Sequence, residues 1–499
     1  MKKVIIIGAG IGGLCTAIRL LNKGYEVTIL EKENKIGGKL NFKEYNGFKF
    51  DLTASVLMTP DIYTKIFEEV DKDYKEYFEL INLDLIYRVN YCDKTYLDIY
   101  SDTRKVINIL EGIQKGLSIE YFNLISTSLK KYLISKNEFL DKPMIDINEI
   151  LTLKSLQSLI QINPITSASK YVSSKISNEK LRNYLIFKSM YIGVNPYTNS
   201  NLYTLIPSIS SMYGLWYIKG GMYNYILSLE KLIKEFKGEI KLNKEVNKIL
   251  IKKDRVVGVK CDDKMYEADI VVCNADYPYA IKSLFKNNIN ELNYNNKNID
   301  NKDYSCSVFI IYLGLSKKYE NLKVHNIYIN DNFREGIESA FRGYIPKQPS
   351  LYIYSPSSID ESMSPKGCSV VNIMVRVPNL KFKDIKWDKK FISTFKDKIM
   401  LEVKNIKGLE DIDKNIVYED YLTPLDLKDK FNSYYGNAFG ISHKLSQVGY
   451  MRPHIKSKNI KGLYFIGSST HPGNGVSVII DGSKIVSEII NKDNIRGEL

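Results

Sequence analysis

Two hydrophobic patterns follow each other at the start of the chain. Residues 4–7 are four aliphatic residues between a lysine and a glycine, which is typical of a strand buried within a parallel sheet. Leu14, Ile18 and Leu21 then recur on one helix face, and a second strand is expected at residues 26–30. A strand, a helix and a strand in this order predict a βαβ unit, and therefore an α/β fold.

Three glycines and one acid give this unit a candidate chemistry. Gly8 permits a tight turn, Gly10 lets backbone N–H groups approach a pyrophosphate, and Gly13 lets the helix pack closely on the sheet. The N-terminus of the helix would then face the anion with unpaired N–H groups. Glu31 stands 21 residues after Gly10, where a carboxylate accepts hydrogen bonds from ribose hydroxyls. We interpret the segment as a dinucleotide site, because a glycine turn that only packs would not explain this acid.

A second pair of glycines follows the acid. Gly37 and Gly38 precede Lys39, and a nicotinamide-binding unit does not need such a pair. In flavoproteins it lets another backbone turn approach the dinucleotide, so the pair favours FAD as the cofactor. Further along, we expect the strand that contains Val246 to supply main-chain contacts to the adenine.

A late glycine turn supports the same cofactor. A strand is expected to end at Gly467 and Ser468, and a loop then leads to a closing helix at 478–490. Gly475 and Val476 would lie at the N-terminus of this helix. Its dipole would stabilise negative charge that develops on the N1 and O2 edge of a reduced flavin.

Between these two ends the pattern is mainly helical from about residue 74 to residue 201. Two apolar stripes recur at helical spacing, and they comprise Ile107, Leu110, Ile113 and Leu117 in one, and Tyr121, Leu124, Ile125, Leu129 and Leu133 in the other. Such stripes commonly face a core. A basic amphipathic lobe is also what a protein needs to lie on a membrane, and both interpretations remain open.

Alternating segments over 305–378 predict an antiparallel sheet that would form the floor of a substrate chamber. The expected architecture is an α/β protein with a Rossmann-type FAD-binding domain, an interleaved α+β substrate domain and a helical lobe that associates with a membrane. The FAD-binding domain would be discontinuous. The expected ranges are 1–73 with 214–284 and 440–499 for the FAD-binding domain, 74–213 for the helical lobe, and 285–439 for the substrate domain.

Composition narrows the choice of partners. Lysine and arginine outnumber the acids 71 to 57 in the 499 residues, which gives a net charge of +14. This charge is scattered, so it describes either a solvated basic surface or a surface attracted to anionic lipid headgroups. Nucleic acid is not expected as a partner, because neither a binding motif nor a concentrated basic stripe is found.

Cysteine spacing and hydropathy point to the cytoplasm. The six cysteines contain no C-x-x-C pair, which argues against a disulfide framework and a zinc site. The apolar run at the N-terminus is too short for a signal peptide, and no stretch approaches about 18 consecutive apolar residues. We therefore expect a cytoplasmic protein that attaches to the inner face of the membrane.

The chain resembles the bacterial carotenoid desaturases of the phytoene and diapophytoene type. The similarity extends in order over essentially the whole chain, through the N-terminal glycine unit and residues 217–222, 238–246, 274–276, 436–440, 449–454, 462–467 and 470–473. Arg452-Pro453-His454 and the segment Thr470-His471-Pro472-Gly473 are more specific to that group than the FAD fingerprint. Many amine oxidase-like flavoproteins share the fingerprint.

This resemblance implies an FAD enzyme that desaturates a long polyprenoid such as phytoene or diapophytoene in carotenoid biosynthesis. Hydride would pass to flavin N5 while a neighbouring carbon loses a proton, so the protein would mainly align the substrate and exclude water. The sequence departs from the family pattern at Thr53-Ala54, Ser477, Val478 and Asp481. The polyprenoid, the number of desaturations, the electron acceptor and the oligomeric state stay open, as does carotenoid isomerisation or oxygenation, which related members perform.

Few side chains are candidates for the chemistry. His471 is a weak candidate for an acid or base, and a role in orienting its loop is the favoured interpretation. Arg452 is expected to bind backbone carbonyls or the cofactor, and Trp216 and Tyr217 to wall a tunnel or to lie in the core. The sequence shows no metal-ligand cluster. The alternative functions are a soluble FAD amine oxidase and a carotenoid-binding protein with a vestigial flavin site.

Overall fold

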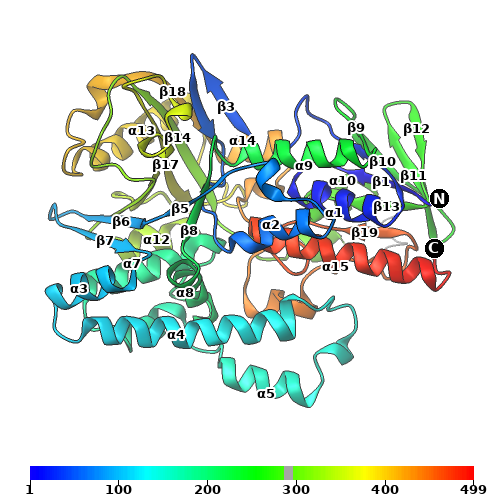
Figure 1. The fold of residues 1–499 in the computed structure, drawn as a ribbon, viewed down its shortest axis with the longest axis horizontal. Helices are drawn as coiled ribbons and strands as arrows, with labels where there is room; N and C mark the ends of the chain where they lie inside the picture. The colour runs from blue at the N-terminus through cyan, green and yellow to red at the C-terminus, as the bar shows by residue number, and fades with distance from the viewer. Residues whose placement is uncertain (286–295) are drawn as a thin grey trace.

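The computed structural model describes residues 1–285 and 296–499 (Figure 1). Of the Asn- and Lys-rich stretch at the start of the expected substrate domain, residues 286–295 lie outside these ranges. One end of the protein is built on a parallel sheet in the order β19-β13-β1-β2-β9. Its strands are β1 (Lys3–Ile7), β2 (Glu26–Leu30), β9 (Glu239–Lys241), β13 (Ile270–Cys273) and β19 (Leu463–Phe465). The predicted βαβ unit is therefore confirmed, and three separate stretches of chain contribute strands to one sheet.

Helices cover this sheet because each has one aliphatic face. The helix α1 (Ile11–Asn22) contacts α9 (Tyr223–Glu235) and α15 (Val476–Ile495), and α2 (Pro60–Glu68) packs on α15 (Figure 1). Leu14 and Ile18 of α1 are fully buried in the resulting core. The closing helix begins two residues before the predicted position. The helix α10 (Tyr277–Leu284) packs on β10 (Val246–Lys252), which pairs with β11 (Arg255–Cys261), and β11 pairs with β12 (Lys264–Glu267).

The other end contains a seven-stranded sheet in the order β18-β14-β17-β16-β15-β6-β7. Its strands are β6 (Leu85–Tyr91), β7 (Tyr96–Tyr100), β14 (Ser307–Leu315), β15 (His325–Ile329), β16 (Leu351–Tyr354), β17 (Ser369–Val377) and β18 (Ile416–Leu422). The predicted antiparallel pairing within 305–378 is confirmed. Phe395 and Ile399 of α13 (Lys389–Lys404) join one core with Phe309 and Ile311 of β14. The helix α12 (Phe333–Arg342) lies near β17.

The prediction of a mainly helical segment missed three strands between residues 80 and 100. Strand β5 (Leu80–Leu83) pairs with β8 (Leu215–Ile218), while β6 runs parallel to β15 and extends the large sheet. In β6, Tyr87 and Val89 are buried and Arg88 between them is less so. This alternation has the period of a strand, so the sequence contained the signal.

Helices dominate from residue 103 to residue 212. They are α3 (Thr103–Ile113), α4 (Leu117–Ser135), α5 (Leu153–Ile162), α6 (Ala168–Ser173), α7 (Glu179–Ser189) and α8 (Leu205–Met212). In Figure 1, α4 and α5 form the lower edge of the molecule. The first predicted stripe is only partly core, because Ile107 and Ile113 are 37% and 48% exposed while Leu110 and Leu117 are buried. In the second stripe, Tyr121, Leu124 and Ile125 are buried, and Leu133 is exposed.

The remaining elements are short. They are β3 (Phe42–Tyr45), β4 (Phe48–Asp51), α11 (Asn296–Asp300) and α14 (Pro424–Phe431). All six cysteines carry free thiols. Within the described ranges, no helix is both long enough and apolar enough to cross a bilayer.

Candidate functional site

A cavity of about 920 Å³ connects the two ends of the molecule. It begins at the carboxyl ends of β1 and β2, where open α/β sheets bind their ligands, and it continues between the second sheet and the helical region. The second sheet contributes Val308, Tyr352, Met374 and Arg376, and α5 contributes Leu156, Leu159 and Ile162. We call this cavity the chamber. Its volume lies at the upper end of the range for small-molecule pockets, about 300–1,000 Å³.

Two glycine turns meet at one end of the chamber. Gly10 is the N-cap of α1 and provides no side-chain cap, so the first N–H groups of this 12-residue helix are open to a ligand. Gly10 forms a bridge with Gly37, and the Gly37 N–H donates to the Ala9 carbonyl at 2.8 Å. A Cβ on Gly38 would lie 3.4 Å from the Gly10 Cα. The two predicted turns are therefore neighbours, and Gly8, Gly10 and Gly38 all line the chamber.

Gly13 is not part of the chamber lining. A Cβ on Gly13 would lie 2.3 Å from the carbonyl oxygen of Gly8, so any side chain there would push α1 away from the end of β1. Gly13 thus has the packing role that its place in the glycine unit predicts.

Glu31 lies at the end of β2 and lines the same part of the chamber. Its carboxylate accepts from the Ala9 N–H at 2.7 Å and from the Glu33 N–H at 3.0 Å. Burial raises its pKa, although these hydrogen bonds oppose the shift. Each carboxylate oxygen retains a second lone pair, which leaves Glu31 able to accept from a ligand hydroxyl. Val246, at the start of β10, is a buried neighbour in the lining.

Lys39 also lies in the chamber wall, where its ammonium donates to the carbonyl of Ala438 at 3.3 Å. Burial lowers the pKa of Lys39. The contact connects the second glycine turn to the segment that precedes the C-terminal strand.

The late glycine turn lines the chamber as well. Gly467 and Ser468 follow β19, and Gly475 is the N-cap of α15 with φ +107° and no side-chain cap. Val476 is the first residue of this 20-residue helix. A second long helix therefore points an uncapped N-terminus at the chamber, as the sequence predicted.

His471 is held against the helical region. Its Nε2 donates to the Lys142 carbonyl at 2.7 Å, its ring is 1% exposed, and burial lowers its pKa to about 4. The ring is neutral at pH 7, so Nδ1 is an acceptor. This geometry fits a residue that orients its loop, and a role in proton transfer remains a hypothesis.

Unsatisfied polar atoms near this loop fit a heteroaromatic ligand. Among the described residues, Asn474 Oδ1, His443 Nδ1 and His471 Nδ1 are buried without a hydrogen-bond partner, and all three residues line the chamber. Buried polar groups in proteins are nearly always paired. Together with two uncapped helix N-termini and two adjoining glycine turns, these atoms fit FAD, with its pyrophosphate at α1 and its ring system near α15.

Several other predictions about side chains are now decided. Arg452 is buried and donates to the carbonyls of Thr470, Ile441 and Ser468. It therefore holds the loop that contains His471 in place, while its own side chain lies outside the chamber lining. Trp216 and Tyr217 also lie outside the lining and pack in cores.

Arg376 and Met374 were missed by the sequence analysis, although β17 contained a signal. Its otherwise apolar run contains polar Asn372 and Arg376, and these share one face with Met374 because strand side chains alternate. In the paired strand, Val308 lies opposite Arg376. The chamber wall is therefore built by this face of the sheet.

Comparisons with known proteins place the chain in a flavoprotein family. Residues 11–481 match the family model of the flavin-containing amine oxidoreductases. The chain is 34% identical to a 4,4'-diapophytoene desaturase (4,4'-diaponeurosporene-forming) of Staphylococcus haemolyticus, over 99% of this chain and 100% of that protein. The corresponding protein of Staphylococcus aureus strain Newman is also 34% identical, with the same coverage.

Solved structures share the fold at low sequence identity. An oxidoreductase from Methanosarcina mazei has a TM-score of 0.66 and 17% identity, over 97% of this chain and 100% of that one. A wild-type putrescine oxidase bound to putrescine has a TM-score of 0.61 and 12% identity, over 98% and 99% of the two chains. These two structures have the same overall fold as this chain.

Proposed function

Because the chain belongs to the family of flavin-containing amine oxidoreductases, whose cofactor is FAD, we propose that it desaturates a long polyprenoid of the diapophytoene type. The observation that carries this proposal is the full-length identity of 34% to diapophytoene desaturases, which agrees with the resemblance found in the sequence.

The chamber supports the proposal because its far part is made of apolar side chains. Ile206 and Ile209 of α8 face it together with Leu156, Leu159 and Ile162 of α5. A long hydrocarbon gains free energy when such a surface removes it from water, at about 25 cal/mol per Å². These walls would hold the chain beside the cofactor site in one alignment and keep water out.

FAD, when bound, supplies a two-electron oxidant that accepts hydride. The residues of this chain would position it: the two glycine turns at the pyrophosphate, Glu31 at the ribose, and Gly475 and Val476 at the flavin ring. No general acid is required, since a hydrocarbon carries no group to protonate before hydride leaves. The proton lost from the neighbouring carbon needs an acceptor, and the neutral His471 ring in the chamber lining is the candidate.

A membrane surface is the proposed source of substrate. Leu153 and Ile160 of α5 are 80% and 77% exposed, and Leu151 and Ile165 beside the helix are exposed too. Leu151 and Leu156 are exposed and also line the chamber, so the apolar patch and the chamber wall are continuous. Exposed apolar patches of this kind mark interaction sites, and an amphipathic helix in such a patch binds a bilayer interface.

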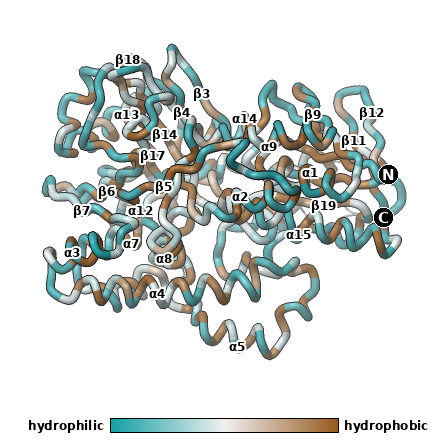
Figure 2. The backbone as a smooth tube through the Cα atoms, viewed as in Figure 1, coloured by the Kyte–Doolittle hydropathy of each residue, from teal (hydrophilic) through white to brown (hydrophobic). Residues whose placement is uncertain are grey.

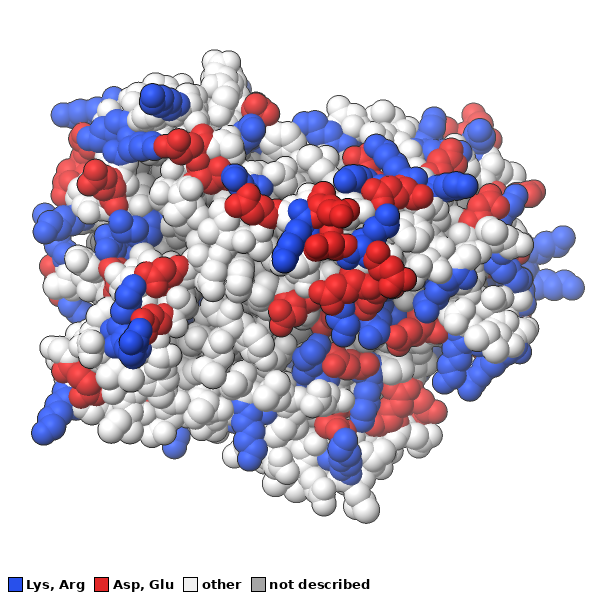
Figure 3. Space-filling model, viewed as in Figure 1, with Lys and Arg blue, Asp and Glu red and all other residues white. Residues whose placement is uncertain are grey.

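Figures 2 and 3 show this surface from one side. Hydrophobic positions recur along α5 at the lower edge of the tube, and few charged side chains cover that edge on the face drawn in Figure 3. We propose attachment through α5 to the inner face of the cytoplasmic membrane. A neutral polyprenoid would then enter the chamber directly from the lipid.

The test is turnover in liposomes. Purified protein loaded with FAD should convert liposome-bound diapophytoene into products whose absorption is shifted to longer wavelength, identified by mass spectrometry. Gly10→Ala places a Cβ 3.0 Å from Asn274 Nδ2 within the cofactor site and should lose FAD and turnover, whereas Gly112→Ala has open space and serves as the control. Unchanged spectra with every polyprenoid, or peroxide formed from small amines, would contradict the proposal.

A further inference from the structure

We propose that Arg376 binds the carboxylate end of a long apolar ligand, so that the chamber accepts chains that end in an oxygen-bearing anion as well as plain hydrocarbons. This inference deepens the proposed function and rests on the chamber being a site for long polyprenoids. The guanidinium of Arg376 has no acidic partner among the described residues.

Arg376 lies within the apolar strand β17 and faces the chamber. Its guanidinium stacks over the ring of Phe439, with 4.5 Å between Cζ and the ring centroid. Nη1 is buried without a hydrogen-bond partner, and the ion pairs found within residues 1–285 and 296–499 do not include Arg376. Burial lowers the pKa of Arg376, but a guanidinium keeps its proton in proteins, so the charge remains.

Three other sheltered arginines among the described residues have partners. Arg88 forms a bidentate contact with Asp98, and Arg19 donates to Glu69 at 2.7 Å. Arg452 has no carboxylate, but backbone carbonyls accept its hydrogen bonds on several sides. Arg376 differs from these three because it lines the chamber and its buried Nη1 has no hydrogen-bond partner among the described residues.

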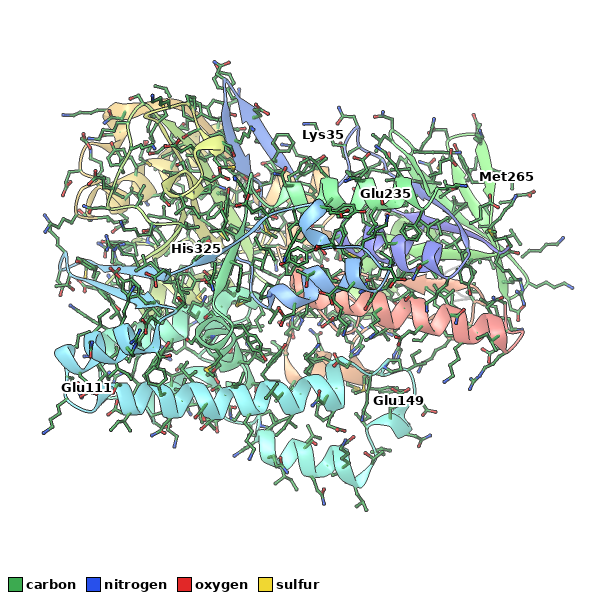
Figure 4. The ribbon with its side chains drawn as sticks, viewed as in Figure 1. Lys35, Glu111, Glu149, Glu235, Met265 and His325 are labelled. Atoms are coloured by element: carbon green, nitrogen blue, oxygen red, sulfur yellow. The ribbon has the colours of Figure 1, made fainter. Side chains whose placement is uncertain are left out.

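The neighbours of Arg376 do not neutralise it. Cys306 and Tyr191 are close enough to affect its charge, and burial raises the pKa of each, so both are neutral at pH 7. The Tyr352 hydroxyl is already hydrogen-bonded to Ser55 at 2.8 Å and to His325 Nδ1 at 2.7 Å. Figure 4 shows His325 on the side of the molecule that holds the second sheet.

Lys188 lies behind the wall, in contact with Tyr191 and outside the chamber lining. It is fully buried, stacks over the rings of Tyr87 and Tyr191 at 3.8 and 4.1 Å, and donates to the Tyr87 hydroxyl. Burial lowers the pKa of Lys188 well below its ordinary value, so the attraction for an anion rests on Arg376. A guanidinium in a low-dielectric wall, with no acidic partner among the described residues, attracts an anion. A carboxylate is the group that a guanidinium fork binds in bidentate geometry.

The rest of the ligand must be apolar. Val308, Met374 and Phe439 line the chamber with Arg376, and the apolar walls of α5 and α8 belong to the same cavity. The pyrophosphate of the cofactor has its own cradle at the N-terminus of α1, on the other sheet. An anionic head on a long hydrocarbon chain is therefore the ligand that matches both the guanidinium and the walls.

Retinoate and retinol are matched probes, since they share a chain and differ in a carboxylate or a hydroxyl. The FAD-loaded protein is titrated with each, and binding is followed by the change in flavin absorption and by quenching of protein fluorescence. We expect retinoate to bind about tenfold more tightly than retinol, as one charge-assisted pair would give. In Arg376→Met the ratio of the two affinities should fall towards one, and Arg376→Lys should keep part of it.

Arg334→Met is the control for net charge, because Arg334 is exposed and stacks on Tyr197 outside the chamber lining. In Arg334→Met, the ratio of the retinoate affinity to the retinol affinity should equal that of the unaltered protein. Equal affinities for the two probes in the unaltered protein would overturn the inference, and so would a ratio that Arg376→Met leaves intact. If Arg376→Met does not fold, the unaltered protein and Arg376→Lys decide the matter.

Two outcomes separate this inference from the proposed function. Loss of FAD from Arg376→Met, measured by ultrafiltration, would mean that Arg376 holds the cofactor, and would contradict a ligand role. Selective retinoate binding without turnover of diapophytoene would support the role of Arg376 and reject the desaturase function. Turnover of diapophytoene without selective retinoate binding would support the desaturase function and reject the role of Arg376.

Discussion

Lys136 at the end of α4 and Asp481 on α15 form an ion pair with 2.6 Å between Nζ and Oδ2, and both side chains line the chamber. Asp481 is one of the positions where the sequence departs from the desaturase pattern. Its ion pair with Lys136 connects the helical region to the parallel-sheet end. Burial disfavours the charge of Lys136, but hydrogen bonds to Asp481 and Asp141 outweigh this and raise its pKa.

This pair should contribute to stability in a salt-dependent way. Both side chains are about a quarter exposed, so we expect a coupling free energy of about 1 kcal/mol between Lys136→Met and Asp481→Asn in a double-mutant cycle of urea unfolding. Because the pKa of Lys136 is raised in the folded state, this contribution persists below pH 10 and is lost as the pH rises further. The exposed pair Lys105 and Asp84 is the control and should show weaker coupling. If the effects of Lys136→Met and Asp481→Asn on the free energy of unfolding are additive, the ion pair does not contribute to stability.

Gly13 should be intolerant of any side chain. In Gly13→Ala the new Cβ meets the Gly8 carbonyl at 2.3 Å, and this is backbone that cannot rotate away. We expect a loss of about 1–3 kcal/mol of stability together with weaker FAD binding, measured by urea unfolding and by fluorescence of released flavin. Gly112→Ala, an exposed helical glycine with open space around it, should be neutral or slightly stabilising.

Acid should destabilise the protein through His471. Its folded pKa of about 4 lies below the ordinary value of 6.5, so the unfolded chain binds more protons between these two values. Stability contributed by the neutral ring is present above pH 6.5 and is lost as the pH falls to 4, by up to about 3 kcal/mol. His471→Gln retains a donor for the Lys142 carbonyl and should flatten the pH dependence of urea unfolding. An identical pH profile for this variant would show that the ring does not resist protonation.

Membrane attachment should depend on α5. Leu153→Glu combined with Ile160→Glu places charge on its most exposed positions and should reduce flotation with liposomes at least several-fold. Met265→Glu is the control, because Met265 is 60% exposed on β12, at the upper right of Figure 4, whereas Glu149 lies at the lower right. Equal flotation of the double variant and the control would argue for attachment through scattered basic charge.

Local sequence was sufficient for the cofactor end of the chain. The glycine unit, Glu31 and the late turn at Gly475 were predicted because their constraints are local: a backbone that must turn tightly, a helix that begins without a cap, and an acid at the end of a strand. The chamber that these residues line, and their position beside one another, agree with that prediction. Binding of FAD by each of them stays a prediction that the Gly10 and Gly13 variants test.

Only the tertiary structure decided the other walls. Strand β6 was missed although its alternation has the period of a strand, but its place in the large sheet was not predictable, because it pairs with β15 more than 230 residues away. Ile107 looked like core and is exposed, since a helical stripe does not tell which part of it another element covers. The position of Arg376 in the chamber wall became clear only from the pairing of strands β14 and β17. Its lack of an acidic partner among the described residues is likewise a property of the folded chain. The sequence by itself predicted where a dinucleotide would be held, because that depends on backbone shape. The tertiary structure decided what lies opposite this place, because a cavity exists only between distant segments.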